Sequence, residues 1–588
     1  MDILFISSIE LLLSNIKPQI GLYSLQNVLK DKYHVKVINF DYLNYIGEFL
    51  YLECIEENIE NITKYILKFN PKVLGFYAIS SSYAISLMVA KRVRLRQPSI
   101  KIIFGGPQAT LTAKESLEVF PFIDAIALGE AELYIGSLID SLINNKDLSS
   151  FQGIAVRNSS DICINYFKDK ISNNDLGNYT VYDFEDIDFD LMENIPIDAG
   201  RGCPFGCTFC STSIFWGRSF RIKPVQQLIH EMNTYHKLFN KNYFTFNHDM
   251  FTADKKYLDE FCQSMIQNNL SFLWSCSSRV DALNNQTILK MKEANCDHIY
   301  IGIETGSQSM QRKIGKHLKL DQVRQTLLIL KDSGISATIS FIYGFPDETV
   351  EEFRDTLKLI EYIFQLGIRR VQLHLFMPLP QTTEVRKVID RLYFDPETAD
   401  VSIFNSRYVN QEIRSMIESN KAIFSQIYTF SSEVRDLYHK IDILVFMFGV
   451  AGAIYKFILA QLLRDYGLER IYYIFKDEII ECYRNIYINN DINIQQNEDF
   501  LVCAYMALAN SVIKKFEMDK KFPEIYQFES HIYDHHISPE SSSAIYKYDI
   551  DVVAIREGGT DKQGAILVKI YKDSAKKIRF DKLYVKIV

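Results

Sequence analysis

The sequence has few cysteines for its length and no excess of positive charge. Its 588 residues include 10 cysteines, and most of these stand alone along the chain. So few cysteines cannot form a disulfide scaffold, and we expect a reducing, cytoplasmic environment. The formal net charge of −8 excludes a global basic field of the kind that attracts nucleic acid. No internal repeat and no low-complexity tract is present.

Long uninterrupted apolar runs are also missing. The stretch 1–19 is apolar but contains Asp2 and Glu10 and has no basic segment, so it predicts a buried strand rather than a signal peptide. The most apolar later stretch, 443–455, is too short to cross a bilayer and predicts a buried helix. We therefore expect no membrane span. A chain of this length exceeds one hydrophobic core, which predicts about two to four domains.

Residues 1–145 alternate short apolar segments with amphipathic ones. Strands are predicted at 2–8, 34–41, 72–80, 101–107 and 124–130. This alternation indicates an α/β domain with a doubly wound, Rossmann-like parallel sheet. Ligands of such sheets lie beyond the carboxyl ends of the strands. The small or polar residues at these ends are Ser80, Ser81, Ser82, Gly105, Gly106, Gly129 and Glu130.

Three further regions follow. Residues 146–193 predict a β-hairpin and an acidic linker. From 194 to 400 the alternation resumes, with strands predicted at 195–200, 242–249, 271–278, 298–304, 336–344 and 369–378. Six β–α units fit an open (β/α)6 partial barrel better than a closed eight-fold one. Residues 401–588 predict a mostly helical region that ends, from about 550 onward, in a small antiparallel β element.

The strongest chemical signal is the segment RGCPFGCTFC. Its cysteines, Cys203, Cys207 and Cys210, follow a C-x3-C-x2-C spacing, and two glycines let the backbone wrap closely around an inorganic core. A structural zinc site requires a fourth ligand, and a disulfide requires an even count of cysteines. Three thiolates suit a [4Fe–4S] cluster that leaves one iron open. The loop follows the first predicted barrel strand, at the end where barrel chemistry occurs.

Here the sequence resembles the radical S-adenosylmethionine (SAM) superfamily, over about residues 194–385. Phe209 matches the family's aromatic residue before the third cysteine, and five later segments stand in the family's order: 246–252, 277–283, 302–308, 342–349 and 377–384. The resemblance implies that the amino and carboxylate groups of SAM bind the open iron. Reductive cleavage then yields a 5′-deoxyadenosyl radical, which implies an electron donor of the flavodoxin or ferredoxin type.

The same resemblance implies a set of SAM contacts. They are Phe209, Asp249, Arg279, Glu304, Ser307 and Gly344. Asp249 would pair with the methionyl ammonium group, although the family's usual Gly-Gly-Glu is missing and a helix N-cap is the alternative. Arg279 would hold a carboxylate, with an ordinary salt bridge as the alternative. Gly344 would let the backbone approach adenine, with a plain turn as the alternative.

A second resemblance covers residues 1 to about 145. The segments 18–29, 73–80, 102–110 and 124–132 are similar to the cobalamin-binding domain fused to radical SAM barrels. The resemblance implies that Ser80, Ser81, Gly105, Gly106, Gly129 and Glu130 bind cobalamin. The D-x-H-x-x-G motif that supplies a cobalt-ligating histidine elsewhere is absent, and no histidine lies between His34 and His230. A degenerate domain without cofactor is the alternative.

Two further segments carry weaker signals. Trp216, Arg218 and Arg221 stand near the cysteine loop and could hold an acidic or aromatic substrate group, or pack onto the barrel rim. The segment HIYDHH, 531–536, could bind a metal, although histidines in such a strand-to-loop segment are usually solvated.

Together the resemblances imply a cobalamin-dependent radical SAM methyltransferase acting on an unactivated carbon of a small molecule or peptide. Methylcobalamin would supply the methyl group, and a second SAM would remethylate the cobalt. Residues 401–588 would shape the substrate pocket. One alternative is a cyclase or rearrangement oxidoreductase with the same cofactors. Another is a non-catalytic cobalamin-binding sensor with a structural cluster. A tRNA methylthiotransferase is disfavoured, because Cys54 is the sole cysteine of the first 145 residues.

Overall fold

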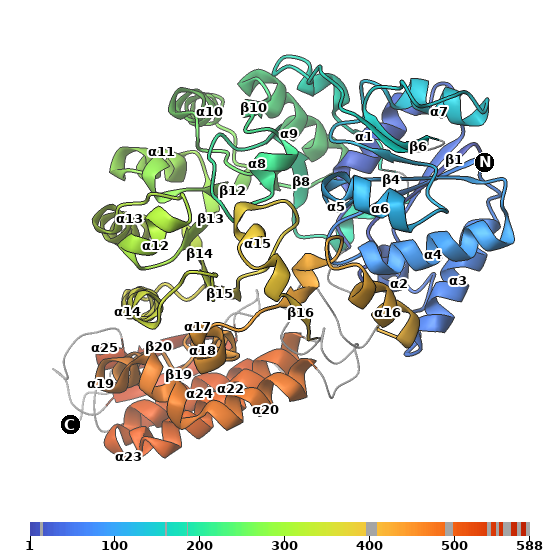
Figure 1. Ribbon diagram of the computed structural model, residues 1–588. Coiled ribbons are helices and arrows are strands. Elements are labelled where there is room, and N and C mark those ends of the chain that lie inside the picture. The colour runs from blue at the N-terminus through green and yellow to red at the C-terminus, as the bar shows by residue number, and fades with distance from the viewer. Residues whose placement is uncertain are drawn as a thin grey trace.

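A computed structural model of the chain is shown in Figure 1. It describes residues 1–11, 16–158, 161–184, 186–395, 409–487, 498–537, 543–548, 552–556, 566–572 and 578–583. Two parallel sheets with their helices lie side by side, and a helical layer packs below the second sheet in the view of Figure 1. The predicted α/β class with a helical C-terminal region is confirmed.

The first sheet has the strand order β2-β1-β3-β4-β5-β6-β7. Its strands are β1 (Ile3–Ile6), β2 (Val35–Ile38), β3 (Val73–Tyr77), β4 (Lys101–Gly105), β5 (Ala125–Ala127), β6 (Ile154–Asn158) and β7 (Asp161–Asn165). The first five run parallel, and β6 and β7 extend them as an antiparallel hairpin. From β1 the chain first adds β2 on one side and then continues with β3, β4 and β5 on the other. This change of side between β1 and β3 opens a crevice at their carboxyl ends.

Seven helices accompany this sheet. They are α1 (Ile20–Leu29), α2 (Phe40–Tyr45), α3 (Ile55–Leu67), α4 (Tyr83–Arg96), α5 (Pro107–Leu111), α6 (Ala113–Val119) and α7 (Ile135–Ile143). The central strands β1 and β3 are apolar and buried on both faces because helices cover both, whereas the edge strand β7 is half-buried or exposed along its length.

The second sheet is an open parallel barrel of six strands, in the order β15-β14-β13-β12-β11-β8. The strands are β8 (Ile195–Asp198), β11 (Tyr243–Asn247), β12 (Leu273–Ser278), β13 (Cys296–Glu304), β14 (Ser336–Tyr343) and β15 (Val371–Leu375). The strands lie at the predicted positions, so the partial barrel is confirmed. A short ladder of β9 (Gly200–Arg201) with β10 (Arg221–Ile222) closes the cysteine-bearing segment into a loop.

Helices follow the barrel strands in turn. They are α8 (Thr212–Phe215), α9 (Val225–Phe239), α10 (Lys255–Gln267), α11 (Asn285–Glu293), α12 (Gln308–Lys313), α13 (Leu320–Ser333), α14 (Val350–Gln365) and α15 (Thr383–Arg386). Their ends obey local rules. A capping box of Thr349 and Glu352 starts α14, and Gly334 ends α13 in the left-handed conformation, with φ +71°.

The C-terminal region packs against the far edge of the barrel. Its helices are α16 (Gln411–Ser419), α17 (Glu433–Leu437), α18 (Ile441–Ala451), α19 (Lys456–Ile474), α20 (Lys476–Tyr487), α22 (Glu498–Lys515), α23 (Met518–Lys521), α24 (Pro523–Ile537) and α25 (Val552–Arg556). The ladders are β16 (Tyr393–Phe394) with β17 (Tyr428–Thr429), and the antiparallel sheet β18 (Ser543–Tyr548), β19 (Ile566–Lys572) and β20 (Ile578–Leu583). Helix α18 packs on edge strand β15 and covers it.

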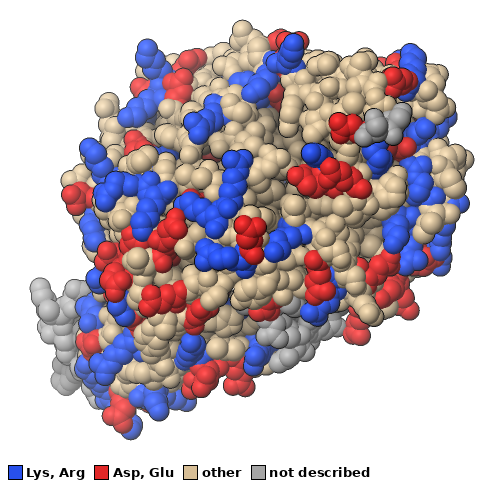
Figure 2. Space-filling model, viewed as in Figure 1, with Lys and Arg blue, Asp and Glu red and all other residues tan. Residues whose placement is uncertain are grey.

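Two details of the C-terminal prediction are corrected. The apolar stretch VVAIR, expected as a strand, is helix α25, and the first strand of the small sheet comes earlier, at β18. The stretch 443–455 lies largely in the buried helix α18, as expected. Among the described residues, none of the helices combines the length and apolarity needed to cross a bilayer. Basic and acidic side chains intermix over most of the face in Figure 2, with a denser basic group near its centre.

Candidate active site between the two sheets

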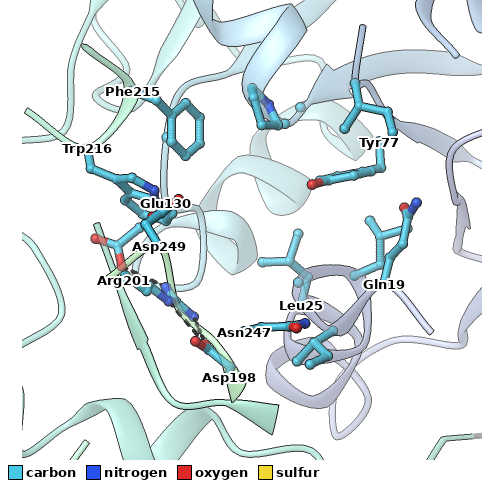
Figure 3. A pocket seen from close by; sticks show the side chains of 18 of the residues that line it. Gln19, Leu25, Tyr77, Glu130, Asp198, Arg201, Phe215, Trp216, Asn247 and Asp249 are labelled. Carbon is cyan, nitrogen blue, oxygen red and sulfur yellow. Dashed lines mark hydrogen bonds and ion pairs between the residues drawn. The ribbon is translucent and has the colours of Figure 1, made fainter. Parts of the chain in front are cut away.

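The carboxyl ends of both parallel sheets open onto one cavity of about 970 Å³. Figure 3 shows Phe215, Trp216 and Asp249 of the barrel domain on one side of it, and Tyr77 of β3 with Gln19 and Leu25 at and within α1 on the other. The cavity therefore lies where strand-end ligands bind in both kinds of fold.

On the first sheet, glycines form the wall of the cavity. A Cβ atom at Gly106 would lie 2.8 Å from the carbonyl oxygen of Ala78, and φ there is +93°, so this position requires glycine. A Cβ atom at Gly105 would meet nothing closer than 3.7 Å. Gly105, Gly106, Gly129 and Glu130 all line the cavity. At these glycines the wall presents backbone in place of side chains, which leaves room for a large ligand to approach between the flanking side chains of Tyr77 and Leu25.

The two serines predicted to bind cobalamin do not line the cavity. The Ser80 hydroxyl donates to Oε1 of Gln108 at 3.0 Å, and the cavity wall nearby is formed by Ile79 and Tyr77. Burial raises the pKa of Tyr77 to about 12, so its hydroxyl stays protonated and can donate a hydrogen bond. A cobalamin-binding role for Ser80 and Ser81 remains a prediction.

Histidines enter the cavity from the barrel side alone, as far as the described residues show. These are His248 and His298. Both ring nitrogens of His248 are engaged: Nδ1 accepts from the Met250 amide at 2.9 Å, and Nε2 lies 3.1 Å from the Arg221 carbonyl oxygen. Burial lowers the pKa of His248 to about 4, so it stays neutral. No described histidine of the first domain reaches the cavity, so a cobalamin held against the glycine wall would have no histidine ligand from that domain.

The cysteine loop begins directly after β9. A Cβ atom at Gly202 would lie 2.1 Å from the Ser219 carbonyl oxygen, which makes glycine necessary for the close turn. Cys203, Cys207 and Cys210 are all half-buried, and none forms a disulfide. Burial raises the pKa of Cys203 and Cys207, so a thiolate at either position depends on nearby positive charge.

The three thiols fit a cluster better than a single ion. Within the described part of the chain, no group of three or more His, Cys, Asp or Glu side chains is gathered closely enough to hold one metal ion. In a [4Fe–4S] cluster each thiolate binds a different iron, so the sulfur atoms stand farther apart than in a mononuclear zinc site. This geometry disfavours zinc.

Arg279 frames the cysteine loop rather than the cavity. Its Nε and Nη2 atoms form a fork on the Asp281 carboxylate at 3.0 and 2.8 Å, and Nη1 lies 4.0 Å from Sγ of Cys207. The guanidinium also stacks on the Phe205 ring, 3.8 Å from its centroid. The salt-bridge alternative therefore describes Arg279 here, and its positive charge supports the Cys207 thiolate. A contact of Arg279 with SAM remains a prediction.

Glu304 also lies beside the cysteine loop. It sits at a bulge at the end of β13 with φ +70°, an uncommon conformation for a residue with a side chain. Its carboxylate pairs with Nζ of Lys316 at 2.6 Å. Such a strained, strand-end carboxylate is typical of a functional position, and its role toward SAM stays a prediction. Ser307 follows as the N-cap of α12, where its hydroxyl oxygen accepts from the Met310 amide at 3.4 Å.

Gly344 and Phe209 make protein contacts. The Gly344 amide donates to the Glu348 carboxylate at 2.6 Å, and its carbonyl oxygen accepts from Nε of Arg435 at 2.9 Å. A Cβ atom at Gly344 would lie 2.8 Å from Cγ of Arg435. The space beside this glycine is therefore filled by the C-terminal region. The Phe209 ring packs edge-on against Phe345, with centroids 5.7 Å apart.

Asp249 follows β11 and lines the cavity. The Thr212 hydroxyl donates to its Oδ1 at 3.4 Å, and burial raises its pKa. The N-cap alternative is wrong, because Asp254 caps the next helix, α10, through the amides of Lys256 and Tyr257. The Asp249 side chain is exposed to the cavity and could accept a hydrogen bond from a ligand ammonium group, as predicted for SAM.

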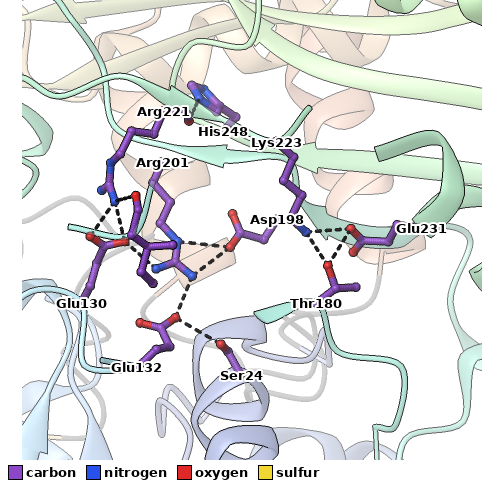
Figure 4. A network of polar contacts seen from close by, with 11 residues as sticks. Ser24, Glu130, Glu132, Thr180, Asp198, Arg201, Arg221, Lys223, Glu231 and His248 are labelled. Atoms are coloured by element: carbon purple, nitrogen blue, oxygen red, sulfur yellow. Dashed lines mark hydrogen bonds and ion pairs between the residues drawn. The ribbon is translucent and has the colours of Figure 1, made fainter. Parts of the chain in front are cut away.

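A buried ion-pair network joins the two sheets, and sequence reasoning missed it. Arg201, from β9, contacts Glu130 at 2.6 Å, Glu132 at 2.7 Å and Asp198 at 3.1 Å (Figure 4). Arg221 pairs with Glu130 at 2.7 Å. Glu130 and Glu132 follow β5 of the first sheet, so each arginine ties the barrel to that sheet. Glu130, predicted to bind cobalamin, lines the cavity as part of this network.

The three residues predicted to act near the cysteine loop, Trp216, Arg218 and Arg221, lie in different surroundings. The Arg221 guanidinium is committed to Glu130 and to the Ile171 carbonyl oxygen, at 2.9 Å, and lies 5.7 Å from the centroid of the Trp216 ring. Its Nε and Nη2 atoms are buried without a hydrogen-bond partner among the described residues, and binding of a substrate acid by Arg221 stays a prediction. Trp216 lines the cavity, and Arg218 is exposed outside it.

Uncharged polar side chains cover the barrel side of the cavity. They are Thr245, Asn247, Ser275, Ser277, His298 and Tyr300, at alternate positions of three neighbouring strands, β11 to β13. Nε2 of His298 lies 2.9 Å from the Thr338 hydroxyl, and the Tyr300 hydroxyl donates to Gln372 at 3.1 Å. Their period of two within otherwise apolar strands is the signal by which the sequence could have identified them.

None of the described residues of 401–588 lines the cavity, and a role of this region in shaping it stays a prediction. This region instead supports β15 and the turn at Gly344. The segment 531–536 belongs to helix α24 and not to a strand-to-loop segment, and the side chains of His535 and His536 lie outside the described residues.

Comparison with known proteins gives the same two halves. The sequence profile of the radical SAM superfamily matches residues 197–360, and that of the B12 binding domain matches residues 13–138. An uncharacterized methyltransferase of Pyrococcus horikoshii is 30% identical over 379 residues, which are 64% of this chain and 79% of that protein. An anaerobic magnesium-protoporphyrin IX monomethyl ester cyclase of Rubrivivax gelatinosus is 27% identical over 51% of this chain and 56% of its own.

The fold is likewise shared with a solved structure. The cobalamin-dependent S-adenosylmethionine radical enzyme OxsB, with aqua-cobalamin and SAM bound, aligns with a TM-score of 0.56 and 14% identity over 88% of this chain and 80% of its own. The two matched domains meet at the cavity described above. The chain therefore belongs to the cobalamin-binding radical SAM superfamily, whose cofactors are a [4Fe–4S] cluster, SAM and cobalamin.

Proposed function

We propose that this enzyme is a methyltransferase that acts on an unactivated carbon. The observation that carries the proposal is the shared cavity, which is lined on one side by the glycine wall of the first sheet and on the other by Ser211 and Thr212, directly after the cysteine loop of the barrel. A cobalamin against the first and a cluster at the second would face one enclosed space. Holding reactants in line without water is the main contribution that the protein makes in such chemistry.

When bound, the cluster with SAM supplies a 5′-deoxyadenosyl radical, and cobalamin carries a methyl group. For each substrate methylated, two SAM and two electrons are consumed. One each of 5′-deoxyadenosine, methionine and S-adenosylhomocysteine is released. The residues of this chain have three tasks: the three cysteines hold the cluster, Asp249 orients an ammonium group, and the polar side chains of β11 to β13 position the substrate. The lining favours a small molecule or peptide segment with uncharged hydrogen-bonding groups.

Similarity to the Pyrococcus methyltransferase supports methyl transfer, since the shared segment covers 64% of this chain. Similarity to the Rubrivivax cyclase supports a second candidate, a ring-forming oxidoreductase that uses the same cofactors. The two differ in the fate of the substrate radical. A methyltransferase quenches it with a methyl group, whereas a cyclase joins it to another atom of the substrate.

The test uses anaerobically reconstituted full-length protein with cobalamin, SAM and dithionite. A methyltransferase releases 5′-deoxyadenosine and, because SAM remethylates the cofactor, S-adenosylhomocysteine. A cyclase releases 5′-deoxyadenosine alone. Release of neither product, from protein whose iron and cobalamin content is complete, would contradict both candidates and favour a binding protein.

A further inference from the structure

Three separate segments contact the outer side of the cysteine loop. The Thr208 amide donates to the Ile314 carbonyl oxygen at 3.0 Å, just after α12, and the Thr383 amide of α15 donates to the Thr208 carbonyl oxygen at 3.1 Å. The third segment is the turn at Arg218, whose guanidinium would lie 2.8 Å from a Cβ atom at Gly206. The loop is thus framed by these segments on the side away from the cavity.

Each segment carries exposed basic residues. Together they form what we call the loop-side patch: Arg218, Arg312, Lys313, Arg386 and Lys387. Lys313 and Lys387 pair with Glu352 at 2.8 Å and Asp347 at 2.7 Å. Among the described residues, no carboxylate lies within ion-pair distance of the other three. The patch therefore keeps a net positive charge.

This local charge contrasts with the chain as a whole, whose net charge is −8. Figure 2 shows the basic group on the face that carries α12 and α15 in Figure 1. The acidic residue nearest the loop, Glu384, is 2% exposed, accepts from the Thr208 hydroxyl and pairs with Lys387 at 2.9 Å, so the surplus positive charge of the patch rests on its three arginines. A compact basic area on an acidic protein attracts an acidic partner by long-range steering.

The position of the patch beside the cysteine loop indicates that its partner delivers electrons. Pro204, in the loop, is exposed, and the three cysteines are half-buried, so the cluster position lies a short way beneath this surface. The opposite side of the loop leads into the cavity that cofactors and substrate would occupy. Electrons for SAM cleavage must therefore enter from the outer side.

We propose that the loop-side patch docks a small acidic electron-transfer protein of the flavodoxin type. The inference rests on the proposed function, because it presumes a cluster that needs reducing. In the transfer, the flavin hydroquinone of the donor loses one electron and one proton and becomes a semiquinone. The electron passes to the oxidised cluster, the proton goes to solvent, and no covalent bond forms between the proteins.

The decisive variant is the double substitution Arg312→Glu/Arg386→Glu, with Arg312→Gln/Arg386→Gln as a milder form. The matched control is Lys255→Glu/Lys256→Glu, which changes the net charge equally at the exposed start of α10. Production of 5′-deoxyadenosine is measured with two reductants: dithionite, and a flavodoxin kept reduced by its NADPH-dependent reductase. A ferredoxin in place of flavodoxin distinguishes the two classes of acidic donor.

We expect the flavodoxin-driven rate of Arg312→Glu/Arg386→Glu to fall about tenfold at low salt, with the dithionite-driven rate unchanged. Raising the ionic strength should lower the flavodoxin-driven rate of the wild type toward that of the variant. The control should behave as the wild type with both reductants. Equal flavodoxin-driven rates in the variant and wild type would overturn the proposal, as would an equal loss with dithionite.

Binding provides a readout independent of turnover. The dissociation constant for flavodoxin should rise about tenfold in the variant and depend less steeply on salt, both in the cluster-loaded protein and in the protein without iron. If the wild type produces no 5′-deoxyadenosine with dithionite, the proposed function fails, and this binding comparison still decides whether the patch docks the donor.

Discussion

The two parallel sheets of this enzyme meet at one cavity but present opposite surfaces to it. The first sheet ends in Gly105, Gly106 and Gly129, which offer backbone and little else. The barrel end carries polar side chains from Thr245 to Tyr300 on the cavity and, beside it, three thiols and the strained carboxylate of Glu304. The first sheet thus offers backbone where its glycines stand, whereas the barrel end is built of functional side chains.

The contrast indicates how each half binds its ligand. A large preformed cofactor needs a smooth wall, since close contact over its area supplies the affinity and any added atom disturbs it. A cluster and SAM need chelating and charged groups in fixed positions, because their recognition is chemical rather than steric. Substitutions that remove side-chain atoms should therefore impair ligand binding at the barrel. Substitutions that add atoms should impair it at the first sheet.

The largest effect should follow from removing a cluster ligand on the barrel side. In Cys207→Ala the cluster loses one of three protein thiolates, so we expect iron content and visible absorbance to fall to a small fraction and reductive SAM cleavage to be abolished. Cys54→Ala changes an exposed cysteine of the first domain and should leave both properties intact. Iron analysis and 5′-deoxyadenosine assays measure the difference. Full cluster content in Cys207→Ala would contradict the assignment.

Next in size is the loss of the charge that joins the sheets. Arg201→Met preserves bulk but leaves the buried carboxylate of Glu132 and the partly exposed one of Asp198 without their arginine, and breaking a buried ion pair costs about 3–5 kcal/mol. We expect a clear fall in Tm and weaker cobalamin binding, because the two walls of the cavity are no longer held together. Arg464→Met, on the exposed face of α19, is the control. An unchanged Tm in Arg201→Met would show that the network does not join the halves.

On the first sheet, one added methyl group should separate folding from cofactor binding. Gly106→Ala places a Cβ atom 2.8 Å from a backbone oxygen at φ +93°, so both Tm and cobalamin affinity should fall, with a strain of about 1–3 kcal/mol. Gly105→Ala meets nothing closer than 3.7 Å, so Tm should hold while affinity falls, because the methyl group narrows the wall. Gly136→Ala, in open space on α7, should affect neither adversely. Titration of cobalamin by its visible spectrum distinguishes the three, and unchanged affinity in Gly105→Ala would contradict the glycine wall.

The same contrast explains what sequence reasoning could reach. The strands of both sheets were predictable because short apolar runs alternate with amphipathic helices, and a local motif placed the three cysteines at the end of β8 and β9. The stretch VVAIR failed as a strand because β-branched residues favour a strand only weakly when tertiary packing differs, and here they form α25.

Contacts between segments far apart in the chain could not be predicted from the sequence. Arg201 stands 69 residues from Glu132, and Arg435 stands 91 residues from Gly344, so neither pairing leaves a periodic or spacing signal. These long-range partners show protein contacts at Glu130, predicted to bind cobalamin, and at Gly344, predicted to contact SAM or to form a plain turn. Gly106, whose place at a strand end follows from local pattern, does line the cavity, and its contact with cobalamin stays a prediction.

The smallest effect, and the sharpest comparison of the halves, is pH dependence. Each half contains a buried carboxyl group whose pKa is strongly raised. Burial raises the pKa of Asp41 in α2, beside the first sheet, to about 7, and that of Glu348, after β14 of the barrel, to about 8. A raised pKa means that the folded chain holds the proton more tightly than the unfolded chain. Each group thus adds stability below its ordinary pKa that is lost as pH rises through the folded value.

We therefore expect the decline in Tm between pH 5 and about 7 to be shallower in both Asp41→Asn and Glu348→Gln, by about one or two degrees. Between about pH 7 and 8 only Glu348→Gln should differ from the wild type in the slope of Tm against pH, because Asp41 has already ionised there. Glu293→Gln, an exposed position of α11, is the control. Thermal melts of the iron-free protein at unit pH steps measure this, and melting curves that shift in parallel at every pH would contradict the buried, protonated state of both groups.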